Sequence, residues 1–379
     1  MKINILLPYK EKFDENKASS VSITVKNNLL HTKFLSDITV YGQNVENPLF
    51  KNNFEGIKYS IFSLKSRNLF LAHKMLKMIS KETSEKQLIE IHNRPYLIEQ
   101  IAKKSNFPIT LFLHNDPQTM KGSKSVKDRQ NILEKCEAVF CVSEFIKSKF
   151  LEGISIKTEK VHILYNGVDR KIKKFPIKKK EILFVGRLVS EKGADLYVKT
   201  LRSIASNFPD WNFGLIGSFR LGEHKNTNSY AHRVIKNFKE IGSQAFFYGF
   251  KNQEFVEEKM KTASIIVIPS IWEEPFGLVA AEAMSNGISI IASKVGGMPE
   301  IIGDNGVLIE NINYKKLRKN LIELLKNNSL RESYQKKAWK NFKLSSAVSS
   351  KKLDNYRRTI FENYYWCFSI LDIEKQQSQ

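Results

Sequence analysis

The chain has 379 residues, 42% of them hydrophobic and 26% charged, with a formal net charge of +22. This length suits two domains better than one core, and the composition excludes an intrinsically disordered chain. No apolar run approaches the roughly 20 residues that a membrane-spanning helix needs, and the N-terminal segment becomes charged after Tyr9, unlike a signal peptide. Cys136, Cys141 and Cys367 are an odd number of cysteines without metal-ligand spacing, so we expect reduced thiols in a cytoplasmic protein.

The positive charge requires either an anionic partner or a compositional reason. Nucleic acid, an anionic membrane face and phosphorylated substrates are the partner classes that it allows. The alternative is a sequence bias toward lysine and asparagine, and the lysines of 171–180 are typical of an exposed linker. The candidate lysines for contact with anionic lipid or a phosphorylated glycolipid are Lys121, Lys124, Lys127, Lys147 and Lys149.

In the first half of the chain, short apolar runs alternate with helix-like patterns. We expect helices at 18–31, 68–79 and 96–104, and a further helix that ends at Lys135. Strands are expected at 3–9, 38–41, 59–62, 87–92, 109–114 and 138–142.

The second half repeats this alternation. Strands are expected at 182–185, 213–216, 246–248, 265–268 and 288–292. Helices are expected at 194–206, 230–241, 253–263, 276–286, 314–327 and 330–342, followed by an aromatic-rich helical tail at 350–371.

This alternation predicts an α/β fold of two doubly wound halves, each with a mostly parallel sheet covered on both faces. Proline, lysine and low apolar content coincide at 171–180, which we expect to be the linker. The first domain is then expected over 1–170 and the second over 181–349. In such folds the ligand lies at the carboxyl ends of the strands.

The stretch 264–303 contains a predicted strand, a short turn, a helix and another strand. The turn carries Glu274, with Pro275 at the expected first helical position and Gly277 just inside the helix. A helix N-terminus leaves backbone N–H groups unpaired and carries a positive dipole end, which favours an anion such as a diphosphate.

Other turns after second-half strands have matching chemistry. Arg187 and Lys192 supply positive charge, while glycines let the backbone approach a ligand. In the first half, two strands end at His92 and His114. The turns expected to border the ligand also contain Gly217, Phe250, Gly296 and Gly297.

The segment from Glu274 to Glu282 resembles the E-x7-E motif of retaining glycosyltransferases of family 4. Segments 166–169 (NGVD), 186–193 (GRLVSEKG) and 295–300 (VGGMPE) agree with that family in order and spacing. In the first half, LLPYKEKF, IEIHNRP and LFLHNDPQTMKG are similar to segments of bacterial lipopolysaccharide-core and polysaccharide transferases.

The resemblance implies the GT-B fold of two facing Rossmann-like domains, with the C-terminal helix 350–379 crossing back to pack on the first domain. It also implies that Glu274 contacts the transferred sugar and that His114 lies near its anomeric centre or a hydroxyl group. Glu282 would accept hydrogen bonds from the ribose. The residues implied for the rest of the donor are Arg187, Lys192, Gly277, Leu278, Gly217 and Phe250.

The expected reaction needs no metal and no cofactor beyond the nucleotide-sugar donor, for which a UDP-sugar is the expectation. Fixed positive charge would stabilise the departing diphosphate, and the chain has no Asp-x-Asp pair for a divalent ion. Retention would follow from front-face attack, with double displacement through a carboxylate as the open alternative. The chain departs from the family at 17–21 (KASSV), where many members have a Gly-Gly loop, which affects the acceptor side most.

The sequence therefore predicts a glycosyltransferase that moves a hexose or N-acetylhexosamine to a lipopolysaccharide-core or other cell-surface glycan. We expect it in the cytoplasm, with peripheral association at the inner face of the membrane as an option. One alternative is a GT-B synthase of the glycogen or sucrose type. The other is a basic nucleic-acid-binding protein, although we expect no nucleic-acid partner, and this alternative predicts steeply salt-dependent binding that survives Glu274→Ala.

Overall fold

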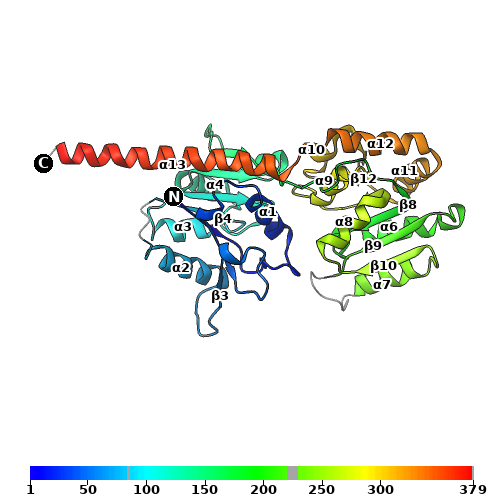
Figure 1. Ribbon diagram of the computed structural model, residues 1–379, viewed down its shortest axis with the longest axis horizontal. Helices are drawn as coiled ribbons and strands as arrows, with labels where there is room; N and C mark the ends of the chain where they lie inside the picture. The colour runs from blue at the N-terminus through cyan, green and yellow to red at the C-terminus, as the bar shows by residue number, and fades with distance from the viewer. Residues whose placement is uncertain (83–85, 220–228, 378–379) are drawn as a thin grey trace. The chain divides into compact units, whose positions relative to one another are not determined.

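A computed structural model describes residues 1–82, 86–219 and 229–377, and describes side chains of the last helix only as far as Tyr365 (Figure 1). The described chain divides into two compact units. The first unit comprises residues 1–167 and 346–379, and the second comprises residues 168–345.

The described strands of the first unit form a parallel sheet in the order β3-β2-β1-β4-β5-β6-β7. Successive strands extend to one side of β1 and then to the other, so the order reverses between β1 and β4. At such a reversal the loops after the two strands diverge and leave room for a ligand. The strands are β1 (Lys2–Leu6), β2 (Ile38–Gln43), β3 (Phe54–Ile57), β4 (Gln87–His92), β5 (Ile109–Leu113), β6 (Ala138–Cys141) and β7 (Val161–Ile163).

Helices cover both faces of this sheet. Apolar side chains of β1, β2 and β4 pack with α1 and α13 in one core, which includes Ile3, Val25 and Phe361. A neighbouring core joins β5, β6 and α13 through Phe112, Phe140 and Leu353. The described helices of this unit are α1 (Ser20–Leu29), α2 (Arg67–Ile79), α3 (Leu97–Ala102), α4 (Val126–Lys135), α5 (Glu144–Leu151) and α13 (Ser346–Gln377).

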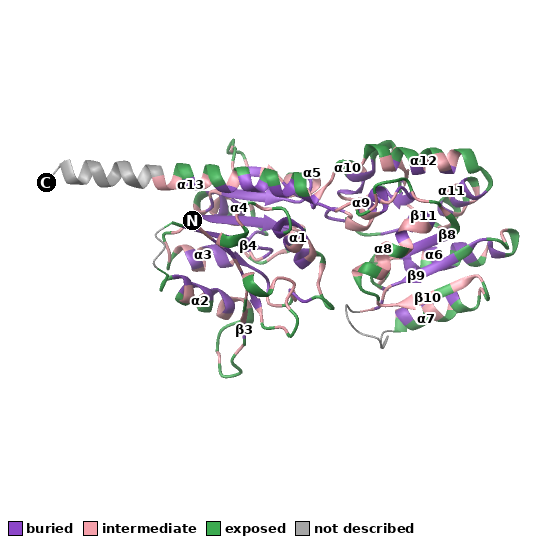
Figure 2. Ribbon diagram, viewed as in Figure 1, coloured by how far each residue is buried: buried purple, intermediate pink, exposed green. Residues whose placement is uncertain are grey.

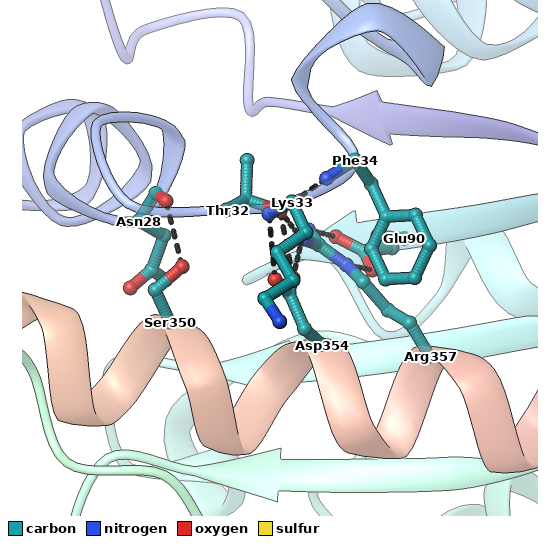
Figure 3. Close-up of polar contacts among 8 residues, drawn as sticks. All are labelled: Asn28, Thr32, Lys33, Phe34, Glu90, Ser350, Asp354 and Arg357. Atoms are coloured by element: carbon teal, nitrogen blue, oxygen red, sulfur yellow. Dashed lines mark hydrogen bonds and ion pairs between the residues drawn. The ribbon is translucent and has the colours of Figure 1, made fainter.

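The C-terminal helix α13 is fixed to the first unit by a buried ion-pair network (Figure 3). The guanidinium group of Arg357 donates to both carboxylate oxygens of Glu90 in β4, each at 2.8 Å, and to Asp354 at 3.2 Å. Asp354 also accepts hydrogen bonds from Thr32 and from the backbone of Lys33. Arg357 is 2% exposed and Glu90 1%, so each charge depends on the other for its solvation.

The described strands of the second unit form a parallel sheet in the order β10-β9-β8-β11-β12-β13. Here the order reverses between β8 and β11, so the loops after these two strands border the expected ligand site. The strands are β8 (Lys179–Val185), β9 (Asn212–Ile216), β10 (Ala245–Gly249), β11 (Ala263–Ile268), β12 (Ser289–Ser293) and β13 (Val307–Ile309).

The core of the second unit lies where one face of the sheet meets α6, α7 and α11. It contains strand residues such as Phe184 and Val267 and helix residues such as Tyr197, Phe238 and Leu321, and Figure 2 shows these strands as buried. The described helices of this unit are α6 (Ala194–Arg202), α7 (Ser229–Lys239), α8 (Gln253–Thr262), α9 (Leu278–Ser285), α10 (Met298–Ile302), α11 (Tyr314–Lys326) and α12 (Asn328–Asn341).

The alternation of parallel strands and helices predicted from the sequence is confirmed, but two local predictions were wrong. The expected strand at 59–62 is not a strand, and the edge strand lies earlier, at Phe54–Ile57. The helix expected from position 276 begins at Leu278 with Gly277 as its N-cap, so Pro275 precedes the helix. The sequence reasoning also missed α5, α10 and β13, which are eight residues or shorter.

The aromatic tail packs on the first unit, as the sequence predicted. The rings of Tyr356 and Phe140 make an edge contact at 5.1 Å, and Tyr365 hydrogen-bonds the backbone of Gln87. Trp366, Cys367 and Phe368 lie outside the described side chains. In the described part of the chain, no helix combines the length and apolarity required to cross a bilayer.

Candidate active site

The loops after β8 and β11 of the second unit are tied together at the point where the strand order reverses. The backbone amide of Ile271 donates to the carbonyl of Glu191 at 2.9 Å. Gly193 lies against Pro269, so closely that a Cβ at this position would overlap the proline carbonyl. These contacts hold the loop that carries Lys192 against the loop that carries Glu274.

Lys192 and Glu274 form an ion pair at the centre of this site. The ammonium nitrogen of Lys192 lies 2.5 Å from Oε1 of Glu274, which also accepts a hydrogen bond from the Ser270 hydroxyl at 2.5 Å. Glu274 is 6% exposed, whereas the Lys192 side chain is 23% exposed and lies over the Trp272 ring. The pair therefore combines a buried carboxylate with a cation that solvent, or an anionic ligand, can still reach.

The backbone of Glu274 is held by the glycine pair that the sequence singled out. The amide of Gly297 donates to the carbonyl of Glu274 at 2.7 Å. Gly296 has a φ of 54° and lies so close that a Cβ would overlap the same carbonyl. A side chain at position 296 would displace Glu274, so these glycines position the carboxylate through its backbone.

Helix α9 begins directly after this loop. Its N-cap, Gly277, has a φ of 98°. A Cβ atom at this position would lie 2.3 Å from the sulfur of Met298, so a side chain would not fit here. The amides of Ala280 and Ala281 donate to the Gly277 carbonyl, while helix geometry gives the preceding amides, including that of Leu278, no partner within the helix. The start of α9 therefore has backbone N–H groups of the kind that can bind an anion, and the anion site at this turn stays a prediction.

The remaining predicted donor residues lie along the same edge of the sheet. Arg187 follows β8 and is exposed. Gly217 follows β9, and its amide donates to the Gly249 carbonyl at 2.8 Å. Phe250 follows β10 and is partly exposed. Each of these residues therefore follows a strand at the carboxyl edge.

Glu282, the second glutamate of the E-x7-E segment, lies on α9 and is half-buried. Burial, assisted by the nearby Glu257 carboxylate, raises the pKa of Glu282 to about 8. The group is therefore largely protonated at neutral pH in the free protein. A ligand that donates hydrogen bonds to it would favour the ionised form and lower this pKa.

In the first unit, the strand-end histidines contact each other. Nδ1 of His92 lies 2.9 Å from Nε2 of His114, and the His92 ring stacks between His114 and Phe112, with centroid separations of 5.1 and 4.5 Å. The backbone amide of His114 donates to the side chain of Asn93 at 2.9 Å. Both histidines were singled out from the sequence, but no sequence pattern predicted that His92 and His114 contact each other.

Burial keeps both imidazoles neutral. It lowers the pKa of His114 to about 4 and, with smaller contributions from His114 and Arg357, holds the pKa of His92 well below its ordinary range. Nε2 of His92 is buried without a hydrogen-bond partner in the described structure, and a buried N–H left unpaired is rarer than an unpaired acceptor. This pattern favours the tautomer with the shared proton on Nδ1 of His92, in which His114 carries its own proton on Nδ1.

The segment 17–21, where many members of the resembled family have two glycines, instead forms the N-terminal cap of α1. Ser19 caps α1 by accepting from the Ser22 amide, and its hydroxyl donates to the Glu11 carboxylate. Burial raises the pKa of Glu11, and the charge of Arg94 opposes that shift. Glu11 and Ser19 follow β1 and Arg94 follows β4, so they border the reversal in the first sheet.

The structure brings several predicted site residues together. Lys192 pairs with Glu274, and His114 contacts His92, while Gly277 and Leu278 begin the helix that also carries Glu282. Sequence reasoning assigned no role to three residues of these clusters: Ser270, Glu11 and Arg94. Glu11 and Arg94 lie within the family-like segments LLPYKEKF and IEIHNRP, whereas only its position after β11 could have indicated Ser270.

The described side chains contain no cluster of three or more His, Cys, Asp or Glu residues that could hold a metal ion. The two described cysteines, Cys136 and Cys141, are buried thiols whose pKa burial raises strongly. Neither thiol is therefore suited to act as a nucleophile at neutral pH.

Two family models match the chain. The model of glycosyl transferases group 1 matches residues 167–341, which correspond closely to the second unit. The model of Glycosyltransferase Family 4 matches residues 36–171. Both units are therefore represented among the matches.

Individual proteins agree with these models. The glycosyltransferase MJ1178 of Methanocaldococcus jannaschii is 30% identical, over 74% of each chain. The lipopolysaccharide 1,2-N-acetylglucosaminetransferase of Salmonella typhimurium is 27% identical, over 59% of this chain and 58% of that enzyme. The structure of Anabaena Alr3699/HepE in complex with UDP and glucose has a TM-score of 0.74 at 17% identity, over 94% of this chain and 99% of that one, which shows a shared fold.

Proposed function

Because this chain belongs to the group 1 glycosyltransferases of family 4 and has the GT-B fold, we propose that it is a retaining, metal-independent transferase with a cell-surface glycan acceptor. The transferred group is a hexose or N-acetylhexosamine from a nucleotide-diphosphate sugar. The acceptor is a lipopolysaccharide core or a related glycan. The observation that carries this proposal is the Lys192–Glu274 pair beside the N-terminus of α9, where the strand order of the second unit reverses.

The diphosphate of the donor binds this edge of the second unit. Arg187 and Lys192 supply its countercharge, and the first amides of α9 donate to its oxygens. Lys192 is still partly exposed while it pairs with Glu274, so a phosphate can share the ammonium group. The same fixed charges stabilise the diphosphate as it leaves, which is the main electrostatic requirement of the reaction.

The sugar and ribose are recognised by hydrogen bonds. Glu274 accepts from hydroxyl groups of the transferred sugar, and Ser270 keeps its carboxylate oriented. His114 hydrogen-bonds the transferred sugar, as the family resemblance implies, and Nδ1 is the ring nitrogen that does not contact His92. Glu282 accepts from the ribose hydroxyls and becomes ionised in the complex.

Transfer with retention proceeds by front-face attack. The bond between the anomeric carbon and the diphosphate oxygen breaks, and a bond to the acceptor oxygen forms on the same face. The acceptor hydroxyl gives its proton to an oxygen of the leaving phosphate, so no side-chain nucleophile is consumed. UDP and glucose in the complex of Anabaena Alr3699/HepE support a UDP-sugar donor for this chain, and the activity named for the Salmonella relative supports an N-acetylhexosamine as the transferred group.

A thermal-shift screen against UDP, GDP, ADP and their sugar conjugates tests the proposal. We expect one nucleotide series, that of UDP, to stabilise the protein, and Arg187→Ala to reduce that stabilisation because the diphosphate loses a cation. Arg202→Ala is a matched control, since Arg202 is a partly exposed arginine at the far end of α6. If no nucleotide stabilises the protein at millimolar concentration, the proposal is wrong.

A further inference from the structure

The loop after β3 exposes an unusual set of apolar side chains. Phe62 is 89% exposed, Ile61 84%, and Leu64 is as exposed as in an extended peptide. Figure 2 shows this loop as an exposed segment that extends away from the sheet of the first unit, next to β3. Single exposed apolar residues are normal on a protein surface, but three within four positions at the tip of a loop indicate a binding surface.

Positive charge surrounds this tip. Lys58 and Lys65 flank the apolar residues and are both exposed. The following helix, α2, exposes Lys74 and Lys77 on one face, and Lys81 continues this face after the helix ends. Across residues 51–82 the sequence contains seven lysines and arginines but only two glutamates, so the surface is complementary to an anionic partner.

The loop is held in shape by contacts at its base. The Tyr59 hydroxyl hydrogen-bonds the carbonyls of Ser63 and Lys65 at 3.2 and 3.0 Å. The Tyr59 ring makes an edge contact with Phe70 at 5.1 Å, and the Arg67 guanidinium group lies 5.7 Å from its centroid. Ile61, Phe62 and Leu64 are therefore presented by an ordered turn, which reduces the entropy lost on binding.

We propose that this loop is a membrane anchor: Ile61, Phe62 and Leu64 insert into an anionic bilayer while the surrounding lysines contact lipid headgroups. The apolar residues form a projecting tip rather than a groove, which suits entry into a lipid layer. The long lysine side chains can reach the headgroups while the tip lies deeper. This inference rests on the proposed function only in that a membrane surface would bring the enzyme to a glycolipid acceptor.

The test is co-sedimentation of the full chain with sucrose-loaded vesicles. One set contains phosphatidylcholine alone, and the other contains phosphatidylcholine mixed with phosphatidylglycerol. We expect binding to the anionic vesicles and much weaker binding to the neutral ones, with binding falling as salt rises. Replacing Ile61, Phe62 and Leu64 with serine should weaken partitioning by about a thousandfold, because each of the three buried side chains contributes roughly tenfold.

Matched variants separate this loop from general basicity. Ile177→Ser removes an isoleucine that is 91% exposed between lysines in the second unit, and it should leave binding unchanged. A second control removes positive charge elsewhere on the first unit by combining Lys121→Gln, Lys124→Gln and Lys127→Gln. This triple variant should weaken vesicle binding less than the serine variant does. UDP binding by the serine variant, measured without vesicles, would show that its fold is intact.

Equal sedimentation of the wild-type protein and the serine variant would overturn the proposal, as would equal binding of the wild type to neutral and anionic vesicles. Insertion can also be observed directly. Phe62→Trp should add fluorescence that shifts to the blue on addition of anionic vesicles. An unchanged spectrum, with the protein bound, would show that another surface makes the contact. Failure of UDP binding would instead contradict the proposed function and leave the vesicle result intact.

Discussion

Lys192→Met separates the structural role of the Lys192–Glu274 pair from its role in donor binding. The substitution keeps much of the length of the lysine side chain but removes the ammonium group 2.5 Å from Oε1 of Glu274. Glu274 is 6% exposed, so its carboxylate remains in a poorly hydrated position, with Ser270 as a remaining donor. Removing one partner of a fully buried ion pair costs about 3–5 kcal/mol.

Lys192 is 23% exposed in the pair, so the expected loss of unfolding free energy is smaller, about 2 kcal/mol. For a unit of this size, that corresponds to a fall in Tm of roughly 4–8 °C. Tryptophan fluorescence is a suitable probe, because Trp211, Trp272 and Trp339 lie in the second unit and only Trp366 lies in the first.

The double variant Lys192→Met/Glu274→Gln completes the test. Glutamine removes the unpaired charge, so most of the lost stability should return, while UDP binding stays weak because the cation is still absent. Lys199→Met is a control, since Lys199 is an exposed lysine on α6. The reasoning is refuted if Lys192→Met unfolds at the wild-type temperature, or if the double variant binds UDP as tightly as the wild type.

Four further predictions concern buried titratable groups. His92→Phe retains a ring against Phe112 but removes the Nδ1 donor to His114, so the transfer rate should fall about tenfold with UDP affinity unchanged, as steady-state kinetics and calorimetry can measure. The pKa of His114 is about 4 in the folded protein, against an ordinary 6.5, so the unfolded state binds more protons between these two pH values. The free energy of unfolding should therefore decrease by about 3 kcal/mol as pH falls from 6.5 to 4. Denaturant titrations should show a weaker pH dependence for His114→Gln. Because the pKa of Glu282 is about 8 in the free protein and falls when ribose hydroxyls bind, UDP binding at pH 7 should release protons, which calorimetry in buffers of different ionisation enthalpy detects. Arg357→Leu should lower the free energy of unfolding by about 3–5 kcal/mol, since it leaves Glu90 buried without its cation, whereas the exposed neighbour Arg358→Leu should change it by less than about 0.5 kcal/mol.

Three further outcomes would contradict these predictions. Loss of UDP affinity in His92→Phe would show a general structural defect in place of an altered histidine pair. Calorimetry that detects the same proton release for Glu282→Gln as for the wild type would assign the protons to another group. Equal stability of Arg357→Leu and Arg358→Leu in urea would mean that the network holding α13 contributes little to folding.

The sheets could be predicted from the sequence because their central strands are buried on both faces. A run such as 265–268 is apolar throughout, and a parallel strand between two helix layers requires that pattern. The edge strand was misplaced because tertiary context, not local propensity, decides between two short apolar runs. Residues 59–62 contain Ile61 and Phe62, which a strand pattern favours, yet these side chains are exposed and the sheet pairs with Phe54–Ile57.

Lys192 and Glu274 could be named from the sequence, but their contacts could not. Both residues follow strands at the edge of the sheet where a ligand is expected, and their role in binding stays a prediction. Their ion pair joins positions that are 82 residues apart, and the contact of His92 with His114 joins two different strands. Local sequence patterns carry no information about such pairings, which depend on strand order and loop geometry.

The most direct test of the donor site is hydrogen exchange measured with and without UDP. We predict slower exchange for amides at the start of α9, around Leu278, and in the loop of Arg187 and Lys192 after β8, where we propose that the diphosphate binds. Exchange in the loop around Ile61 should not change, because that surface is assigned to lipid. Protection confined to other regions, or no protection at saturating UDP, would contradict the assignment of this edge as the nucleotide-sugar site.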